Sequence, residues 1–98
     1  MRILALDTTR EFGSIALLEA GEVVKEILIH SPEGFSPILF DRIGRLLEAH
    51  GWPVDSVDCF AAASGPGSFT GVRVGLAAIK GLAEATGKPA IGVSNLQA

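Results

Sequence analysis

Two short segments carry residue types that could bind an anion or a nucleotide. Asp7-Thr8-Thr9 follows a short apolar run, and a carboxylate with two hydroxyls at a strand end could hold a hydrated metal ion and a phosphate. The glycine-rich stretch 64–73 precedes a helical pattern, whose first N–H groups lack intrahelical partners and favour an anion. Arg73 falls in the first helical turn, where a positive charge opposes the helix dipole unless something negative lies nearby. The candidates for this site are Asp7, Thr8, Thr9, Gly65, Gly67, Ser68, Thr70, Gly71 and Arg73.

The same residues also have purely structural interpretations. Asp7 could cap backbone N–H groups in a turn, or pair with Arg10 or Arg73, and the glycines could simply turn the chain. A dinucleotide-binding fingerprint is disfavoured because the next strand ends in Gly-Val-Ser-Asn (92–95), without an acidic residue for the ribose. A P-loop is excluded because no Lys-Ser or Lys-Thr follows the glycines.

The remaining reactive side chains form no catalytic constellation. His30 and His50 are far apart and lack metal-ligand spacing, and they enter no Ser-His-Asp or Cys-His arrangement. Cys59 lies in an apolar run and is interpreted as an inert core thiol in a reducing compartment. We therefore expect no catalytic residue, no metal ligand and no cofactor, and even weak ATP or ADP binding is not expected of this lobe alone.

Composition narrows the class of protein further. The chain has 98 residues, of which 48% are hydrophobic and 19% charged, which is typical of one globular domain. Its net charge of -3 disfavours direct binding to nucleic acid through phosphate contacts. No apolar run approaches the ~20 residues that span a bilayer, and no signal peptide is evident. A cytoplasmic protein without membrane contact is predicted.

Five strands and two helices are predicted to position these residues, in the order βββαβαβ. The strands are 2–6, 13–19, 23–30, 57–63 and 89–93, and the helices are 37–50 and 70–86. Ala20-Gly21-Glu22 reads as a hairpin turn. In the third strand, one face is expected to carry Val23, Lys25, Ile27 and Ile29. This order predicts an α/β lobe with a mixed sheet and helices on its faces, as in the ribonuclease H-like lobe duplicated in actin-like (ASKHA) ATPases.

The first helix has signals at both ends. Ser36 suits the N-cap position and Pro37 the first helical position, and Phe35 could pack on Phe40 as a hydrophobic staple. Gly51 is expected to end the helix. Ser94 resembles the N-cap of a third helix, so residues 1–98 are interpreted as a single N-terminal lobe whose second lobe lies outside this chain.

The second helix is lined with small residues on more than one side. Gly71 and Gly75 lie on one face, and Val74, Ala77 and Gly81 lie beside it. Close backbone approach could serve the lobe's own sheet or a second protein, and the pattern leaves both open. The hypothesis is a helix-to-helix interface, in which Gly75→Leu blocks the partner and leaves the lobe folded. Its residues are Ile38, Phe40, Arg42, Arg45, Val72, Gly75, Leu76 and Ile79.

Four segments resemble a known family, the TsaB (YeaZ) family, in its N-terminal lobe. They are 2–9, 65–75, 80–83 and 91–94, and the resemblance extends over nearly the whole chain. The block Gly-Pro-Gly-Ser-Phe-Thr-Gly-Val-Arg-Val-Gly at 65–75 is its most specific part.

The resemblance implies a non-catalytic subunit of tRNA threonylcarbamoyladenosine synthesis. Such a subunit pairs through its N-terminal-lobe helices with the catalytic subunit TsaD, and the small ATPase TsaE joins the larger complex. Together they support threonylcarbamoyl transfer to adenosine 37 of tRNAs that read ANN codons. The chain would then meet tRNA only through the complex, and it would form a homodimer when the partner is absent.

Two other interpretations stay open beside this one. The catalytic paralogue, once described as a glycoprotease of peptidase family M22, binds metal through a histidine pair, and Asn95 stands where its first metal histidine would be. Many TsaB members carry a histidine around Gly34, which this chain lacks, so that histidine's role is not transferred here. A nucleotide-binding ATPase or kinase lobe is the runner-up, and a simple self-associating module is the third possibility.

Overall fold

The computed structural model describes residues 1–31, 34–66 and 69–94. Five strands form one sheet: β1 Arg2–Asp7, β2 Phe12–Glu19, β3 Glu22–His30, β4 Cys59–Ala63 and β5 Ala90–Val93. Two helices are present, α1 Leu39–His50 and α2 Phe69–Thr86, with a short 3-10 helix η1 at Val54–Ser56. The predicted order βββαβαβ is confirmed. Neither described helix is both long enough and apolar enough to cross a membrane.

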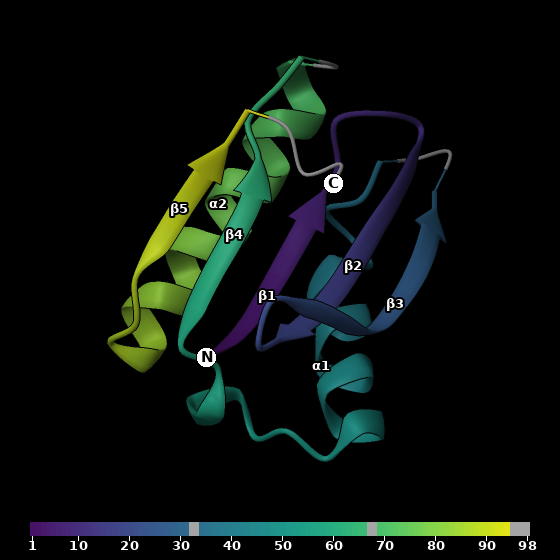
Figure 1. Ribbon diagram of the computed structural model, residues 1–98. Helices are drawn as coiled ribbons and strands as arrows, with labels where there is room; N and C mark the ends of the chain where they lie inside the picture. Colours follow the sequence, from purple (N-terminus) through teal and green to yellow (C-terminus); the bar gives the residue numbers. More distant parts are fainter. Residues whose placement is uncertain (32–33, 67–68, 95–98) are drawn as a thin grey trace.

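The sheet is mixed, as predicted, with the strand order β3-β2-β1-β4-β5. β1 pairs antiparallel with β2 and parallel with β4, and β4 pairs parallel with β5. Figure 1 shows α2 behind β4 and β5, and α1 behind the β1–β2 side of the same face. Among the described elements, therefore, both helices cover the same face of the sheet.

Alternation along β1 and β2 separates a core face from an open face. Leu4 and Leu6 of β1 and Ile15 and Leu17 of β2 are fully buried, and they belong to one core cluster with the helices. From α1 this cluster takes Leu39, Ile43, Leu46 and Leu47. The alternate positions of β1 to β3 form the other face, here called the open sheet face, which includes Ala5, Asp7, Ser14, Ala16, Leu18, Glu26 and Leu28.

One strand position differs from the prediction because of a bulge. The hairpin turns through Ala20 and Gly21, both with positive φ, as the predicted turn requires. The β2–β3 register then shifts between Leu17 and Leu18, which adds one residue to β3. Val23 consequently lies on the open sheet face, not on the face of Ile29 as predicted.

The first helix ends as predicted but begins later. Gly51 has φ 75° and donates its N–H to the carbonyl of Glu48, while Trp52 donates to the carbonyl of Leu47. At the start, however, the carbonyl of Phe35 accepts N–H groups in a turn before the helix, and Ile38 occupies the N-cap position. The predicted Ser36 cap is therefore wrong.

The predicted hydrophobic staple is also absent from this turn. Phe35 is buried in the core cluster, whereas Phe40 is 56% exposed. Phe40 instead shares a hollow with residues of α2. The two aromatic rings therefore serve different surfaces of the lobe.

Candidate functional site

A groove lies between the two helices, with a volume of about 320 Å³. Phe40 of α1 is its most prominent exposed apolar side chain, because its ring lies beside the core stripe of the helix and not in it. Four residues of the first three turns of α2, Thr70, Arg73, Val74 and Ala77, form the opposite side. We call this surface the inter-helix groove, and its full lining is Ser36, Leu39, Phe40, Thr70, Arg73, Val74, Ala77 and Ala78.

One glycine on each helix lies just beyond the groove residues. Gly44 follows Phe40 by four residues and Gly81 follows Ala77 by four, so each lies one turn further along the same side. A Cβ atom added at Gly44 or Gly81 would meet nothing within 4 Å. This surface is therefore low and open, and the structure leaves room on it for atoms of another molecule.

Two of the predicted interface residues prove to be internal. Ile79 is 2% exposed, and a Cβ added at Gly75 would lie 2.6 Å from the Thr8 hydroxyl oxygen. Both positions face the sheet because α2 packs on β4 through this side of the helix. This corrects the expectation that Gly75 and Ile79 meet a partner, and that Gly75→Leu would leave the lobe folded.

The other predicted interface residues lie on several sides of the helix pair. Arg42 and Arg45 both form ion pairs with Asp41, at 3.5 and 3.0 Å. Helical spacing places them away from the side of α1 that carries Phe40. Ile38 packs partly against the core cluster, and Leu76 packs towards β5, with its Cδ2 3.5 Å from a Cβ built at Gly92.

Val72, the last of the predicted interface residues, is half-buried. Of the predicted set, the structure thus brings only Phe40 into the groove. The residues that complete it, Val74, Ala77 and Ala78, had a visible signal in their spacing of three and four along the second helix.

The Asp7-Thr8-Thr9 segment forms a hydrogen-bonded turn at the end of β1. Asp7 Oδ1 accepts the backbone N–H of Thr9 at 3.0 Å and the hydroxyl of Thr9 at 2.6 Å. Thr8 donates its hydroxyl to the carbonyl oxygen of Gly71 in α2 at 2.6 Å. The structural interpretation of Asp7 as a cap is confirmed, since one carboxylate oxygen is engaged within its own turn.

The structure brings the predicted anion-site residues together only in part: Thr8, Thr70 and Gly71 line one hollow of about 380 Å³, but Asp7 and Arg73 do not join them. Asp7 lines a hollow on the open sheet face, whereas Arg73 lines the inter-helix groove on the other side of the sheet. The proposed Asp7–Arg73 pairing therefore does not explain the position of the arginine. Gly65 has φ 141°, and Gly67 and Ser68 lie outside the described residues. Among the residues that the structure describes, no group of three or more His, Cys, Asp or Glu could hold a metal ion.

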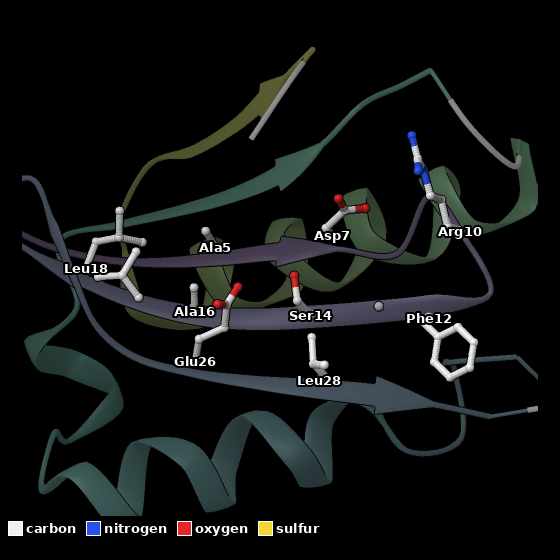
Figure 2. A pocket seen from close by; sticks show the side chains of 11 residues that line it. Ala5, Asp7, Arg10, Phe12, Ser14, Ala16, Leu18, Glu26 and Leu28 are labelled. Atoms are coloured by element: carbon white, nitrogen blue, oxygen red, sulfur yellow. The ribbon is translucent and has the colours of Figure 1, made fainter. Parts of the chain in front are cut away.

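The hollow on the open sheet face has a volume of about 540 Å³ and a mainly apolar lining. Figure 2 shows side chains of β1, β2 and β3 projecting into it, with Asp7 and Arg10 towards one end. Leu28 is 79% exposed and Phe12 65% exposed on this face. Phe12 stacks on the ring of His30, its cross-strand neighbour, at 4.4 Å between ring centroids. The sequence did not single out this face.

Comparisons with known proteins agree with the resemblance in the sequence. A family model described as TsaD, tRNA N6-adenosine threonylcarbamoyltransferase, matches residues 31–98. The TsaB protein of Escherichia coli is 38% identical over 98% of this chain and 41% of its own length. A tRNA N6-adenosine threonylcarbamoyltransferase of Solidesulfovibrio magneticus is 40% identical over 100% of this chain and 30% of its own length. The chain thus spans less than half the length of these relatives.

Solved structures agree with this assignment. YeaZ from Pseudomonas aeruginosa superposes with a TM-score of 0.86 and 37% identity, covering 97% of this chain and 44% of that one. RuvC from Thermus thermophilus, at 13% identity and a TM-score of 0.64, shares the fold alone. The ribonuclease H-like fold is thereby confirmed. The chain belongs to the family defined by the TsaD model, and its similarity to TsaB proteins and to YeaZ makes it a TsaB (YeaZ) family chain.

Proposed function

We propose that this chain acts as a non-catalytic partner subunit in tRNA threonylcarbamoyladenosine modification, and that it docks on a TsaD-type catalytic subunit through the inter-helix groove. The observation that carries the proposal is the exposed Phe40 ring beside an open surface of small residues. An aromatic anchor next to space for a partner's side chains is the usual form of a binding hot spot. The family relationship supplies the kind of partner.

The chemistry of the groove supports a helical partner. Its floor is apolar, from Leu39, Val74 and Ala78, and Arg73 lies at the rim. The small residues Ala77 and Gly81 allow the backbone of a neighbouring helix to approach. The partner's contacting helix is therefore expected to present apolar side chains to this floor.

The wider role follows from the same assignment. The catalytic subunit would carry out threonylcarbamoyl transfer to adenosine 37 of tRNAs that read ANN codons, with a TsaE-type ATPase in the larger complex. This chain would contact tRNA only within that complex. In the absence of its partner, the groove would pair with a second copy of itself.

The test is binding of this chain to the purified TsaD-type subunit from the same organism, by calorimetry and light scattering. Phe40→Ala should weaken binding at least tenfold, about 1.4 kcal/mol, because it removes the aromatic anchor. Leu28→Ala is the matched control, since it removes an exposed apolar side chain from the open sheet face. Ala77→Trp should block the groove, with Leu28→Trp as its control.

The outcomes separate the parts of the proposal. If the wild-type chain forms no complex, the partner role fails. If it binds and Phe40→Ala and Ala77→Trp bind equally well, the contact lies on another surface. A complex that is weakened only by the Leu28 variants would place the partner on the open sheet face.

A further inference from the structure

A buried threonine of β1's end is inserted into the first two turns of α2. The hydroxyl of Thr8 donates to the carbonyl oxygen of Gly71 at 2.6 Å, and Thr8 is only 1% exposed. In a regular helix that carbonyl also accepts the N–H of residue 75, and a carbonyl oxygen has two lone pairs for the two donors. The contact therefore adds a sheet-to-helix bond at the start of α2.

Gly75 is what makes this approach possible. A Cβ at this position would lie 2.6 Å from the Thr8 hydroxyl oxygen, far inside ordinary contact distance. Gly71 supplies the acceptor, and Gly75 supplies the space one turn later. The two glycines of the specific sequence block thus act together as a socket for one side chain.

Thr8, whose side chain enters this socket, is held in place by hydrogen bonds between its neighbours Asp7 and Thr9. Asp7 accepts both the N–H and the hydroxyl of Thr9, which fixes the backbone on either side of Thr8. Thr9 is 4% exposed, so this turn has little freedom to move. The turn can therefore transmit the position of β1 to α2.

The first turns of α2 connect this socket to the inter-helix groove. Thr70 and Val74 line both the groove and a second hollow of about 380 Å³ at the strand ends, which Thr8 and Gly71 also line. A shift of these turns relative to the sheet would move both hollows at once. It would also move Arg73, which lies in the same turn.

We propose that Thr8 is a positioning residue for the partner site: its hydroxyl fixes the first turns of α2 so that Thr70, Arg73 and Val74 present the groove in the geometry the partner recognises. The proposal rests on the proposed function, because it assigns Thr8 a role in that docking. Thr8 does not touch the partner and acts through Gly71.

The test compares Thr8→Val, which keeps the shape and removes the donor, with Thr8→Ser, which keeps the donor. Affinity for the TsaD-type subunit is measured by calorimetry, and amide hydrogen exchange is followed separately in the first and last turns of α2. Thr8→Val should weaken binding about tenfold and speed exchange in residues 70–75 while residues 82–86 keep wild-type exchange. Thr8→Ser should restore both.

Gly75→Ala provides a second perturbation of the same contact, should Thr8→Val fail to fold. It should give the same local pattern, because it displaces the hydroxyl from the helix side. Wild-type affinity in folded Thr8→Val, or exchange that rises equally along α2, overturns the proposal and makes Thr8 purely structural. If the wild-type chain does not bind the partner at all, the proposed function fails, and unchanged exchange at 70–75 would separately overturn the role of Thr8.

Discussion

Alanine at Gly75 should destabilise the lobe, whereas alanine at Gly81 should stabilise it. Both positions are helical glycines, and each alanine removes the backbone freedom of a glycine, worth about 1 kcal/mol in favour of the helix. The two sites differ in what the new Cβ meets. At Gly81 it meets nothing within 4 Å, but at Gly75 it lies 2.6 Å from the Thr8 hydroxyl oxygen.

The expected change in the free energy of unfolding for Gly75→Ala is the sum of two losses and one gain. Overpacking a rigid site costs about 1–3 kcal/mol, and loss of the Thr8–Gly71 hydrogen bond costs about 1 kcal/mol more. Neither loss is easily relieved, because Thr8 is buried and held by its turn. Subtracting the helix propensity gain of about 1 kcal/mol leaves a net loss of roughly 2 kcal/mol in the free energy of unfolding for Gly75→Ala.

Urea unfolding followed by circular dichroism measures both variants against the wild type. Gly81→Ala should raise the free energy of unfolding by about 0.5–1 kcal/mol. In a Thr8→Ala background, Gly75→Ala should lose most of its penalty, since the opposing oxygen is gone. If Gly75→Ala stabilises the chain as much as Gly81→Ala does, the socket geometry is refuted.

Three further predictions concern single groups elsewhere in the lobe. Ala20 has φ 55°, a left-handed conformation that strains alanine, so Ala20→Gly should raise the free energy of unfolding by about 0.5 kcal/mol in urea. The backbone N–H of Arg2 donates to the carboxylate of Asp58 at 2.7 Å, and this hydrogen bond lowers the pKa of Asp58 below the ordinary 3.8. The stability from this contact is therefore present above pH 3.8 and is lost as the pH falls through the pKa of Asp58 in the folded state. Asp58→Asn should reduce the loss of unfolding free energy at acid pH, and an unchanged dependence of that free energy on pH would contradict this reasoning. Burial raises the pKa of Cys59 above 9.0, so a thiol reagent at pH 9 should label the folded chain far more slowly than the chain in urea, and equal rates would show that the thiol is accessible.

The fold could be predicted because its signals are local. Alternation in the first two strands, the helical stripe through Leu39, Ile43 and Leu46, and the glycine at position 51 each predict one element within a few residues of its observed bounds. The predictions that failed are those in which another local interaction set the strand face or the helix start. A bulge moved Val23 to the other face, and a turn through Phe35 delayed the first helix.

The candidate site was harder to predict because it depends on which side of a helix meets the sheet. Spacing showed small residues on several sides of the second helix but did not say which side packs internally. Gly75 and Ile79 were assigned to the partner surface, and they belong to the core. Phe40 was assigned to the same partner surface, and it is exposed because it lies beside the apolar stripe of its helix.

Two glycines six residues apart on the same helix thus have opposite surroundings, and the deciding residue lies in another element. Gly75 is enclosed because Thr8 approaches it from the end of β1, whereas Gly81 faces open space because nothing in the described chain approaches it. A small residue at an internal contact contributes to the stability of the fold, and one at an open surface matters only if a partner comes close. Measuring stability and partner binding on the same pair of alanine variants therefore separates the two roles. Gly75→Ala should lower stability, while Gly81→Ala should keep or raise it, and only a bulky residue at position 81 should weaken docking without loss of fold.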